Sequence, residues 1–415
     1  MTQNLRHTGI YLSNTANKKK LLNDIMRHGL LDDIIKLSGL KGVLYSFSTI
    51  EKMIDEEFRH DRITISTDEN TSLSTMSSGQ QRKALLAWQM AQKPDYMLLD
   101  DVYSNVDKAT QLYINTALEA FSDTTLIVQV FFRHRDLLPF IGTIITVDNN
   151  NKIVKTENKA DFTGFKGESS NHRFLLPDGF NALHPICDPL IELKNVSVKY
   201  EQKQVLSNIN WKIRKGEFWQ LTGPNGSGKS TLVSMLSGDN PKAYGQDITL
   251  FGIKKGSGET IWDIKKYIGY FTPLMIHRFS RADSVENMII SGLNDSVGLY
   301  VEPTDIQRKT ACEWIEMLGS SFRNKTFQQL SVGQQRMVMV ARAMIKHPPL
   351  LILDEPTIEL DDENSRIFID LVKAIAAENE VAIIYVSHRD EDDLQPDKYF
   401  ELIKTDDGYT GRVVL

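Results

Sequence analysis

The sequence has few cysteines and no long apolar stretch. Cys187 and Cys312 are the only cysteines among 415 residues, and their spacing matches no metal site or disulfide framework. The longest apolar runs, at 126–132 and 140–147, fall far short of the roughly 20 residues that span a bilayer. The polar N-terminus also argues against a signal peptide. These features predict a cytoplasmic protein, at most peripheral at the cytoplasmic face of a membrane.

The sequence also has no excess of positive charge. Its formal net charge is −6 and its pI is about 5.9. Because proteins that bind duplex nucleic acid usually present a basic face, no duplex nucleic-acid partner is expected. The length leaves room for two or three domains, each able to bury a core.

An internal repeat organises the chain. The stretches MSSGQQR, MLLDD and HRD in the first half are echoed by LSVGQQR, LLILDE and HRD in the second half, always 254 residues later. The anchoring pairs are Gly79 and Gly333, Asp100 and Asp354, and His134 and His388. Three matches at one offset predict two homologous units.

The two predicted units differ at their starts. Residues 190–415 form a complete second unit, residues 1–165 a first unit, and residues 166–189 a linker rich in glycine, asparagine and proline. The first 75 residues contain no glycine-rich phosphate-binding loop (P-loop). Matching HTGIYLSN at 7–14 with YIGYFTPL at 267–274 predicts that the whole P-loop segment of the first unit is absent. Unpaired strand edges would then make that unit prone to aggregation.

The second unit has a P-loop in the context that the motif requires. The apolar run FWQLT precedes it and LVSMLSG follows, which predicts strand, loop and helix. The expected ATP-binding residues are Gly223, Pro224, Asn225, Gly226, Ser227, Gly228, Lys229, Ser230 and Thr231. Backbone N–H groups would face phosphate oxygens, Lys229 would reach the β- and γ-phosphates, and Ser230 would bind Mg²⁺.

Three further positions complete the predicted chemistry. The buried strand PLLILDEP ends in Asp354, which suits the magnesium shell, and in Glu355, which suits a general base for water. His388 ends the next apolar strand and could hold that water against the γ-phosphate. Tyr200 lies upstream of the P-loop and could stack on adenine, although a purely structural tyrosine is almost as good an interpretation.

Together these motifs resemble an ATP-binding cassette (ABC) ATPase. The order is P-loop, LSVGQ signature, LDE strand, aspartate loop at 358–361 and switch histidine. The run TLFGIKKGSGETIWDIKKYIGY at 249–270 resembles more narrowly the ModF type, soluble proteins with two fused cassettes named for molybdate transport and sometimes for photorepair. One departure is Thr272–Pro273, where most ABC proteins carry a glutamine that couples to a membrane partner.

The resemblance implies an α/β fold of two tandem P-loop NTPase cassettes, the first lacking its P-loop portion. It implies hydrolysis of ATP with Mg²⁺, linked to molybdate transport or its regulation. Because ABC cassettes pair head to tail, Ser77, Gly79, Gln80 and Asp107 of the first unit would close on the nucleotide held by Lys229. That pairing could be intramolecular or could be replaced by a homodimer, and a membrane permease is a further candidate partner.

Two other functions stay open at this point. Proteins of the ABC-F group act on ribosomes and also fuse two cassettes, but they carry a long charged helical linker, unlike the irregular stretch at 148–189. A slow regulatory ATP-binding pseudo-enzyme is the other alternative. Glu355 and His388 argue against it, whereas the missing P-loop argues for it. The first acidic strand also ends in Asp100–Asp101, one methylene shorter than the second, which predicts one fast site and one slow site.

Overall fold

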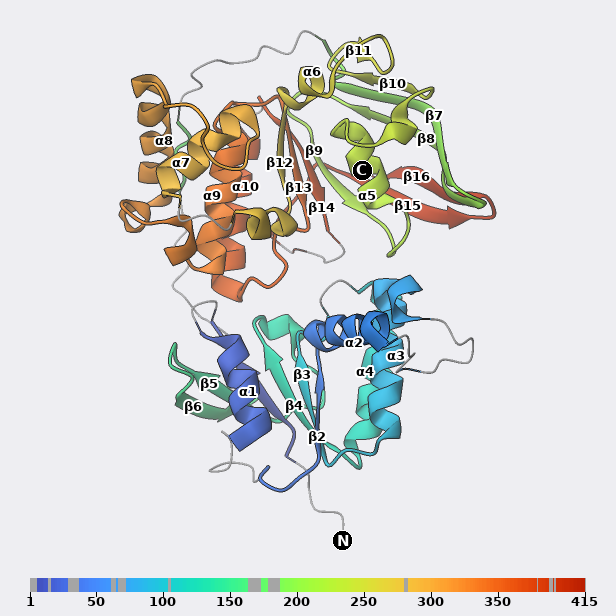
Figure 1. Cartoon of the computed structure of the whole chain (residues 1–415), viewed down its shortest axis with the longest axis vertical. Helices are drawn as coiled ribbons and strands as arrows, with labels where there is room; N and C mark the ends of the chain where they lie inside the picture. The colour runs from blue at the N-terminus through green and yellow to red at the C-terminus, as the bar shows by residue number, and fades with distance from the viewer. Residues whose placement is uncertain are drawn as a thin grey trace. The chain divides into compact units, whose positions relative to one another are not determined.

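The computed structural model of the chain contains two compact units (Figure 1). The first consists of Met1–Ser169 with Glu359–Glu363, and the second of Ser170–Ile358 with Asn364–Leu415. The structure describes residues 6–13, 16–28, 37–60, 65, 72–103, 106–162, 173–177, 187–279, 283–378, 380–387, 391 and 393–414. In this part of the chain, no helix is both long enough and apolar enough to cross a membrane.

The first unit is built on a six-stranded sheet in the order β2-β3-β4-β1-β5-β6. Strands β1 to β5 run parallel, and β6 is antiparallel to β5. The strands are β1 (Thr8–Tyr11), β2 (Gly42–Tyr45), β3 (Tyr96–Asp100), β4 (Leu126–Phe131), β5 (Thr143–Val147) and β6 (Ile153–Asn158). The continuous apolar runs of β3 and β4 fit strands that are covered on both faces.

Helices cover both faces of this sheet. They are α1 (Lys18–His28), α2 (Phe47–His60), α3 (Ser78–Ala91) and α4 (Lys108–Ser122). Leu21 and Ile25 of α1 pack into a cluster with Ile10 on one face, while Leu85 of α3 and Ile114 of α4 belong to a second cluster. The unit is therefore a three-layer α/β sandwich.

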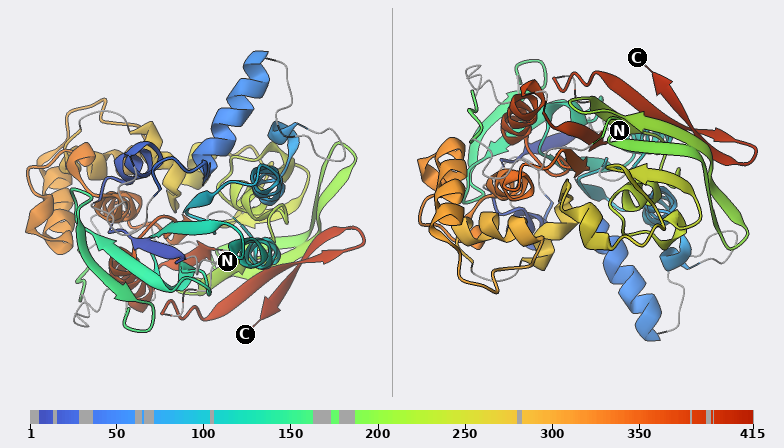
Figure 2. Two further views of the ribbon diagram at one scale, coloured as in Figure 1. Left: turned by 90° about the horizontal axis from the view of Figure 1, so that it is seen from below. Right: turned by 90° about the horizontal axis from the view of Figure 1, so that it is seen from above.

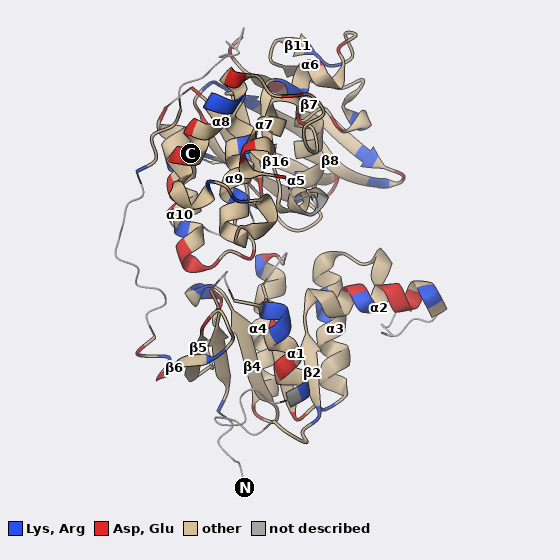
Figure 3. Cartoon of the chain, turned by 60° about the vertical axis from the view of Figure 1, so that its left-hand side comes forward, with Lys and Arg blue, Asp and Glu red and all other residues tan. Residues whose placement is uncertain are grey.

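Helix α2 differs from the other helices of the first unit. It projects beyond the sheet of its own unit (Figure 2). It also carries acidic and basic residues along its length, whereas the core strand β4 has no charged residue (Figure 3). Ile50 and Met53 near its start are buried, but Phe58 near its end is 76% exposed. The buried apolar side chains of α2 therefore come from its first half.

The second unit has a ten-stranded sheet in the order β11-β10-β7-β8-β16-β15-β9-β14-β13-β12. Strands β12, β13, β14, β9 and β15 are parallel, whereas β7, β8, β10 and β11 form an antiparallel layer. Strand β16 joins the two parts, because it pairs with β15 on one side and β8 on the other. The strands are β7 (Ile191–Tyr200), β8 (Lys203–Ile213), β9 (Phe218–Thr222), β10 (Asp247–Leu250), β11 (Ile253–Lys254), β12 (Ile268–Phe271), β13 (Leu350–Asp354), β14 (Ala382–Val386), β15 (Lys398–Thr405) and β16 (Gly408–Val414).

Six α-helices are described in the second unit. They are α5 (Lys229–Leu236), α6 (Ile261–Lys265), α7 (Val285–Ile290), α8 (Asp305–Leu318), α9 (Val332–Met344) and α10 (Asp362–Ala377). Leu232 and Leu236 of α5 are fully buried in one core cluster with Leu206 of β8 and Leu221 of β9. Helix α5 therefore packs on both the parallel and the antiparallel parts of the sheet.

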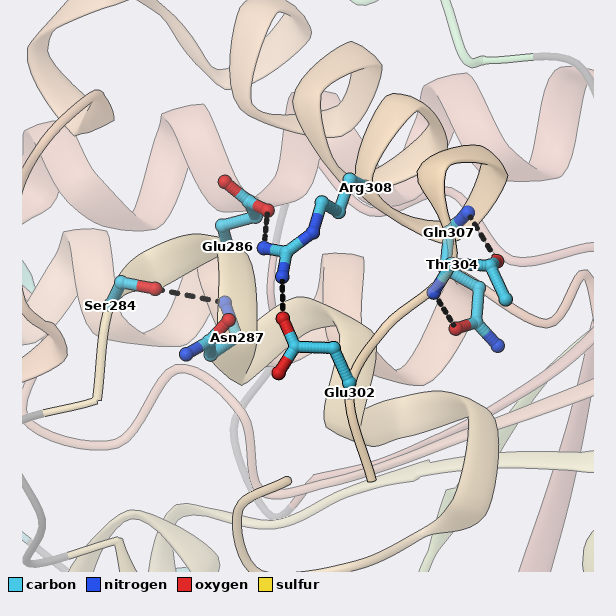
Figure 4. Close-up of polar contacts among 7 residues, drawn as sticks. All are labelled: Ser284, Glu286, Asn287, Glu302, Thr304, Gln307 and Arg308. Carbon is cyan, nitrogen blue, oxygen red and sulfur yellow. Dashed lines mark hydrogen bonds and ion pairs between the residues drawn. The ribbon is translucent and has the colours of Figure 1, made fainter. Parts of the chain in front are cut away.

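A helical layer of α7, α8 and α9 lies beside the parallel strands. Arg308 of α8 links its neighbours by donating to Glu286 of α7 at 3.1 Å and to Glu302 at 2.7 Å (Figure 4). Ser284 caps the start of α7, and Thr304 forms a capping box with Gln307 at the start of α8. These contacts hold in place the helices against which α9 packs.

Candidate functional site

The P-loop of the second unit connects β9 to α5, as the sequence predicts. Gly223, Gly226 and Gly228 have φ angles of +148°, +75° and +96°, which other residues rarely adopt. Helix α5 begins at Lys229, and no side chain caps its N-terminus. The N–H groups in the first turn of such a helix and its dipole favour a phosphate at this end.

The antiparallel layer shapes this loop. A Cβ added at Gly228 would lie 2.6 Å from Cδ2 of Leu206 on β8, closer than side-chain contacts allow. A Cβ at Gly223 would likewise lie 2.9 Å from Cβ of Leu402 on β15. Glycine is required at both positions by the close approach of the neighbouring strands as well as by the φ angles.

Lys229 at the start of α5 and Asp354 at the end of β13 are the two charged residues expected to act on the phosphates and Mg²⁺. The ammonium group of Lys229 is buried and donates to the carbonyl oxygens of Gly223 and Pro224, at 2.8 and 3.0 Å. The Tyr270 hydroxyl donates to Asp354 at 3.5 Å. Burial raises the pKa of Asp354, and the Tyr270 hydrogen bond and Lys229 only partly oppose this. A buried carboxylate at the end of this strand suits a Mg²⁺ ligand.

Of the two other residues predicted to act in hydrolysis, the structure describes only one. Glu355 follows β13 with φ +50°, and its backbone N–H donates to the carbonyl of Val386 on β14 at 2.9 Å. This bond fixes the residue at the carboxyl edge of the sheet, where a general base is expected. Ser387 is buried directly after β14, but the predicted His388 lies outside the described residues.

The remaining second-unit residues lie around the start of α5 or at the end of β7. Ser230 and Thr231 are in the first turn of α5, next to Lys229. Tyr200 ends β7 with 41% of its surface exposed, and its hydroxyl accepts from Asn240 at 3.1 Å. An exposed ring at a strand end is compatible with stacking on adenine, which stays a prediction.

The signature helices of the two units begin in the same way. Ser77 precedes α3 and Ser331 precedes α9, and each forms a capping box with a glutamine three residues later, Gln80 and Gln334. The serine hydroxyl accepts from the glutamine N–H, and the glutamine side chain accepts from the serine N–H. The local geometry that presents a signature serine is therefore the same in both units.

The other two first-unit candidates lie close to Ser77. Asp107 caps the start of α4 and accepts from the N–H of Thr110 at 2.8 Å. Gly79 is buried, and a Cβ added there would lie 2.9 Å from the Thr110 hydroxyl. The starts of α3 and α4 thus meet at Gly79 and Thr110, which brings the predicted signature and aspartate-loop residues to one corner of the unit.

One sequence-based alignment is wrong. Strand β1, which begins at Thr8, lies between β4 and β5, where β9 lies between β14 and β15 in the second unit. The counterpart of β12 is β2, because each is the edge strand beside the acidic strand. The stretch at 7–14 therefore corresponds to the P-loop strand and not to 267–274. The first unit therefore does contain a segment in the place of the P-loop segment, but without its glycine pattern.

Strand register identifies the residue that stands where the P-loop lysine would be. In the first unit, Ile10 and Asp100 both pair with Val130. Lys18 follows Ile10 by eight residues and begins α1.

The second unit repeats this arrangement with the same spacing. Leu221 and Asp354 both pair with Val386, and Lys229 follows Leu221 by eight residues and begins α5. Lys18 is therefore the positional counterpart of Lys229. Sequence reasoning missed it because the search depended on glycines.

Comparison with known proteins also points to a nucleotide-binding protein. Residues 206–358 match the family model described as ABC transporter. The ABC transporter ATP-binding protein ModF of Escherichia coli is 35% identical over 329 residues, which is 76% of this chain and 67% of that protein. The zinc uptake system ATP-binding protein ZurA of Listeria innocua is 35% identical over 48% of this chain and 76% of its own length. An uncharacterized ABC transporter ATP-binding protein of Schizosaccharomyces pombe is 31% identical, and the match covers 69% of this chain and 59% of that protein.

Each of these relatives is an ATP-binding protein by name, and the family-model match at residues 206–358 includes the P-loop, the signature and the acidic strand of the second unit. The glycine-shaped loop, the uncapped helix start, Lys229 and the buried carboxylate of Asp354 fit ATP with Mg²⁺. The chain belongs to the ABC family of ATP-binding ATPases.

Proposed function

We propose that the chain hydrolyses ATP at one composite site, formed by the P-loop of its second unit and the signature of its first unit. The observation that carries the proposal is the shared capping box of Ser77 and Ser331. The first unit keeps a fully formed signature although its own loop lacks the glycines that hold phosphate. A signature retained on such a unit has a use only toward a nucleotide held elsewhere.

The chemistry follows from the second-unit residues. Lys229 and the N–H groups at the start of α5 bind the phosphates, and Glu355 takes a proton from the water whose oxygen attacks the γ-phosphorus. The bond to the ADP oxygen then breaks, and ADP and phosphate leave. Ser230 and Asp354 would hold Mg²⁺, which would neutralise negative charge on the phosphates. His388 keeps its predicted role of holding the water.

A matched pair of substitutions tests which signature is used. Ser77→Ala and Ser331→Ala each remove the same cap, at a similar cost of about 1 kcal/mol in stability. Ser77→Ala is expected to reduce ATP turnover at least about tenfold, and Ser331→Ala to leave it near the wild-type rate. The reverse pattern would show that two second units pair in a homodimer, and the proposal would fail.

Larger substitutions at the neighbouring glycines provide a second comparison. Gly79→Asp is expected to abolish turnover, and Gly333→Asp to retain it. Both positions are tight, because an added Cβ would lie 2.9 Å from Thr110 or 2.1 Å from Asn364. Circular dichroism and melting temperature must therefore accompany the rates, so that a loss of fold is distinguished from a loss of contact with ATP.

The physiological role is proposed from the relatives. The Escherichia coli relative carries the name ModF, and the sequence resembles the ModF type, which is named for molybdate transport. We propose that ATP turnover here supports molybdate uptake or its regulation at the cytoplasmic face of the membrane. Thr272–Pro273 after β12 offers no side-chain amide for coupling to a permease in the usual way. Accumulation of labelled molybdate at limiting supply should fall in cells carrying only Glu355→Gln, with sulfate uptake as the control. Unchanged molybdate accumulation would refute this role.

A further inference from the structure

The first unit contains an ion pair at the corner that corresponds to the nucleotide site of the second unit. Nζ of Lys18 lies 3.2 Å from Oδ1 of Asp100. Asp100 is only 7% exposed, and it ends β3 as Asp354 ends β13. The counterpart of the phosphate-binding lysine is thus joined to the counterpart of the magnesium-binding carboxylate.

The start of α1 is also occupied by a side chain of its own unit. Oδ1 of Asn17 accepts from the N–H of Lys20 at 3.0 Å, so it takes an N–H group in the first turn of the helix. In the second unit, Gly228 stands at this position and no side chain caps α5. At least one of the N–H groups that would bind a phosphate at this helix end is therefore already taken in the first unit.

The surrounding positions are unsuited to a phosphate as well. Leu12, which is fully buried, stands where the second unit has Gly223, and the exposed Lys19 stands where Ser230 would supply a hydroxyl to Mg²⁺. Within the described part of the first unit, no strand corresponds to β8, whose Leu206 presses on the second P-loop. The chain there lacks both the glycines and the strand that shape a phosphate cradle.

We infer that the nucleotide corner of the first unit is permanently filled by Lys18, Asp100 and Asn17, and that this unit binds no ATP at its own loop. The ammonium group of Lys18 pairs with Asp100 in the place where Mg²⁺ is expected beside the corresponding carboxylate of the second unit. The corner is held by a structural ion pair, and its state does not depend on nucleotide. The inference concerns a site that the proposed function does not use, so the two can fail separately.

The pKa shifts of Lys18 and Asp100 are consistent with a stable ion pair. Burial alone would lower the pKa of Lys18, but the carboxylates of Asp100, Glu359 and Asp101 together outweigh it, and the pKa of Lys18 lies above its ordinary value. Burial also raises the pKa of Asp100, and Lys18 opposes that rise. Removing Lys18 would leave a buried carboxylate without its cation, which is strongly destabilising.

Binding stoichiometry of the full chain gives the first test. A non-hydrolysable ATP analogue with Mg²⁺, measured by calorimetry, is expected to bind once per wild-type chain. Lys229→Ala is expected to show no saturable binding. Two analogues per wild-type chain, or one per chain in Lys229→Ala, would overturn the inference.

Thermal stability gives the second test. Lys18→Met is expected to lower the melting temperature by at least about 5 °C while leaving one analogue bound per chain. Lys19→Met, which removes the same charge from an exposed neighbour, should leave the melting temperature unchanged, and Lys18→Arg should retain most of the stability. Loss of analogue binding in Lys18→Met with unchanged stability would show that Lys18 contacts nucleotide, which contradicts the inference.

Should Lys18→Met prevent folding, Asp100→Asn combined with Lys18→Met removes both charges and replaces the carboxylate by an amide of the same shape. The double variant is expected to recover part of the lost stability, because the carboxylate no longer needs a cation. Equal losses in the single and double variants would show that the two side chains do not act as a pair.

Discussion

Nζ of Lys255 lies 3.1 Å from Oε1 of Glu259, and the two side chains are only 1% and 3% exposed. The pair closes the short loop between β11 and α6, and the carboxylate also accepts from the N–H of Gly256 at 2.9 and 3.0 Å. The loop belongs to the stretch that resembles the ModF type, and α6 packs near Gly238 at the end of the P-loop helix. The buried ion pair therefore stabilises the loop that leads into α6, the helix that lies near the end of α5.

This pair predicts a pH dependence of stability. Burial would raise the pKa of Glu259, but the N–H groups of Gly256 and Glu259 and the Lys255 ammonium hold it down to about 2, against an ordinary value of 4.5. A carboxyl whose folded pKa is lowered contributes stability above its unfolded pKa and loses that contribution as the pH falls. The free energy of unfolding should fall between pH 4.5 and pH 2, and Glu259→Gln should flatten that dependence. Urea titrations at several pH values measure both, and an equal slope in the variant would contradict the assignment.

The general base predicts a separation of binding from hydrolysis. Glu355→Gln should keep ATP binding and lower the hydrolysis rate roughly 100- to 10,000-fold, because the amide cannot accept the proton of the attacking water. Equilibrium binding of labelled ATP and a phosphate-release assay distinguish the two effects. A variant that hydrolyses at the wild-type rate would remove Glu355 from this role.

A change of carboxylate length should affect ATP turnover in the second unit and not in the first. Glu355→Asp is expected to slow turnover about 100-fold, because the carboxylate retreats by about one ångström. Asp101 occupies the same place in the first unit, with φ +47° against +50° for Glu355. Asp101→Glu should leave the rate unchanged, since no phosphate is bound beside it. A clear rise in turnover with Asp101→Glu would show that the first unit does hold ATP.

Gly292 predicts a structural sensitivity far from the P-loop. A Cβ added there would lie 1.9 Å from the carbonyl oxygen of Arg342 in α9, so backbone must move to admit it. Gly292→Ala should cost about 3 kcal/mol in the free energy of unfolding. Gly245→Ala is the control, because its φ is +79° but nothing lies within 4 Å, and it should cost roughly 1 kcal/mol. Equal losses, measured by chemical denaturation, would contradict the packing argument.

Much of the second unit could be predicted from sequence because each of its motifs is tied to a particular local backbone structure. A P-loop requires glycines at fixed spacing, and the strand with Asp354 and Glu355 is a continuous apolar run that ends in two acids. The serine and glutamine of each signature similarly predict the start of a helix. In such cases the backbone conformation requires that residue pattern, so the sequence is sufficient to predict the local structure.

The start of the first unit could not be predicted in the same way. The single offset of 254 residues holds only from the signature onward, since Lys18 and Lys229 are 211 residues apart. The second unit has additional helical residues between β12 and its signature, including α7 and α8. Distance from the signature was therefore a misleading guide, and only the pairing of β1 with β4 and β5 identifies Lys18.

The position of β16 has a consequence for how the second unit forms during synthesis. Every other strand of its sheet precedes β16 in the sequence, yet the sheet runs from β8 to β15 only through β16. While a ribosome is still translating this region, the early antiparallel hairpin and the parallel strands each have an unpaired edge. The described sheet is therefore complete only once β16 has been added, and the P-loop that rests on Leu206 and Leu402 acquires its final shape only then.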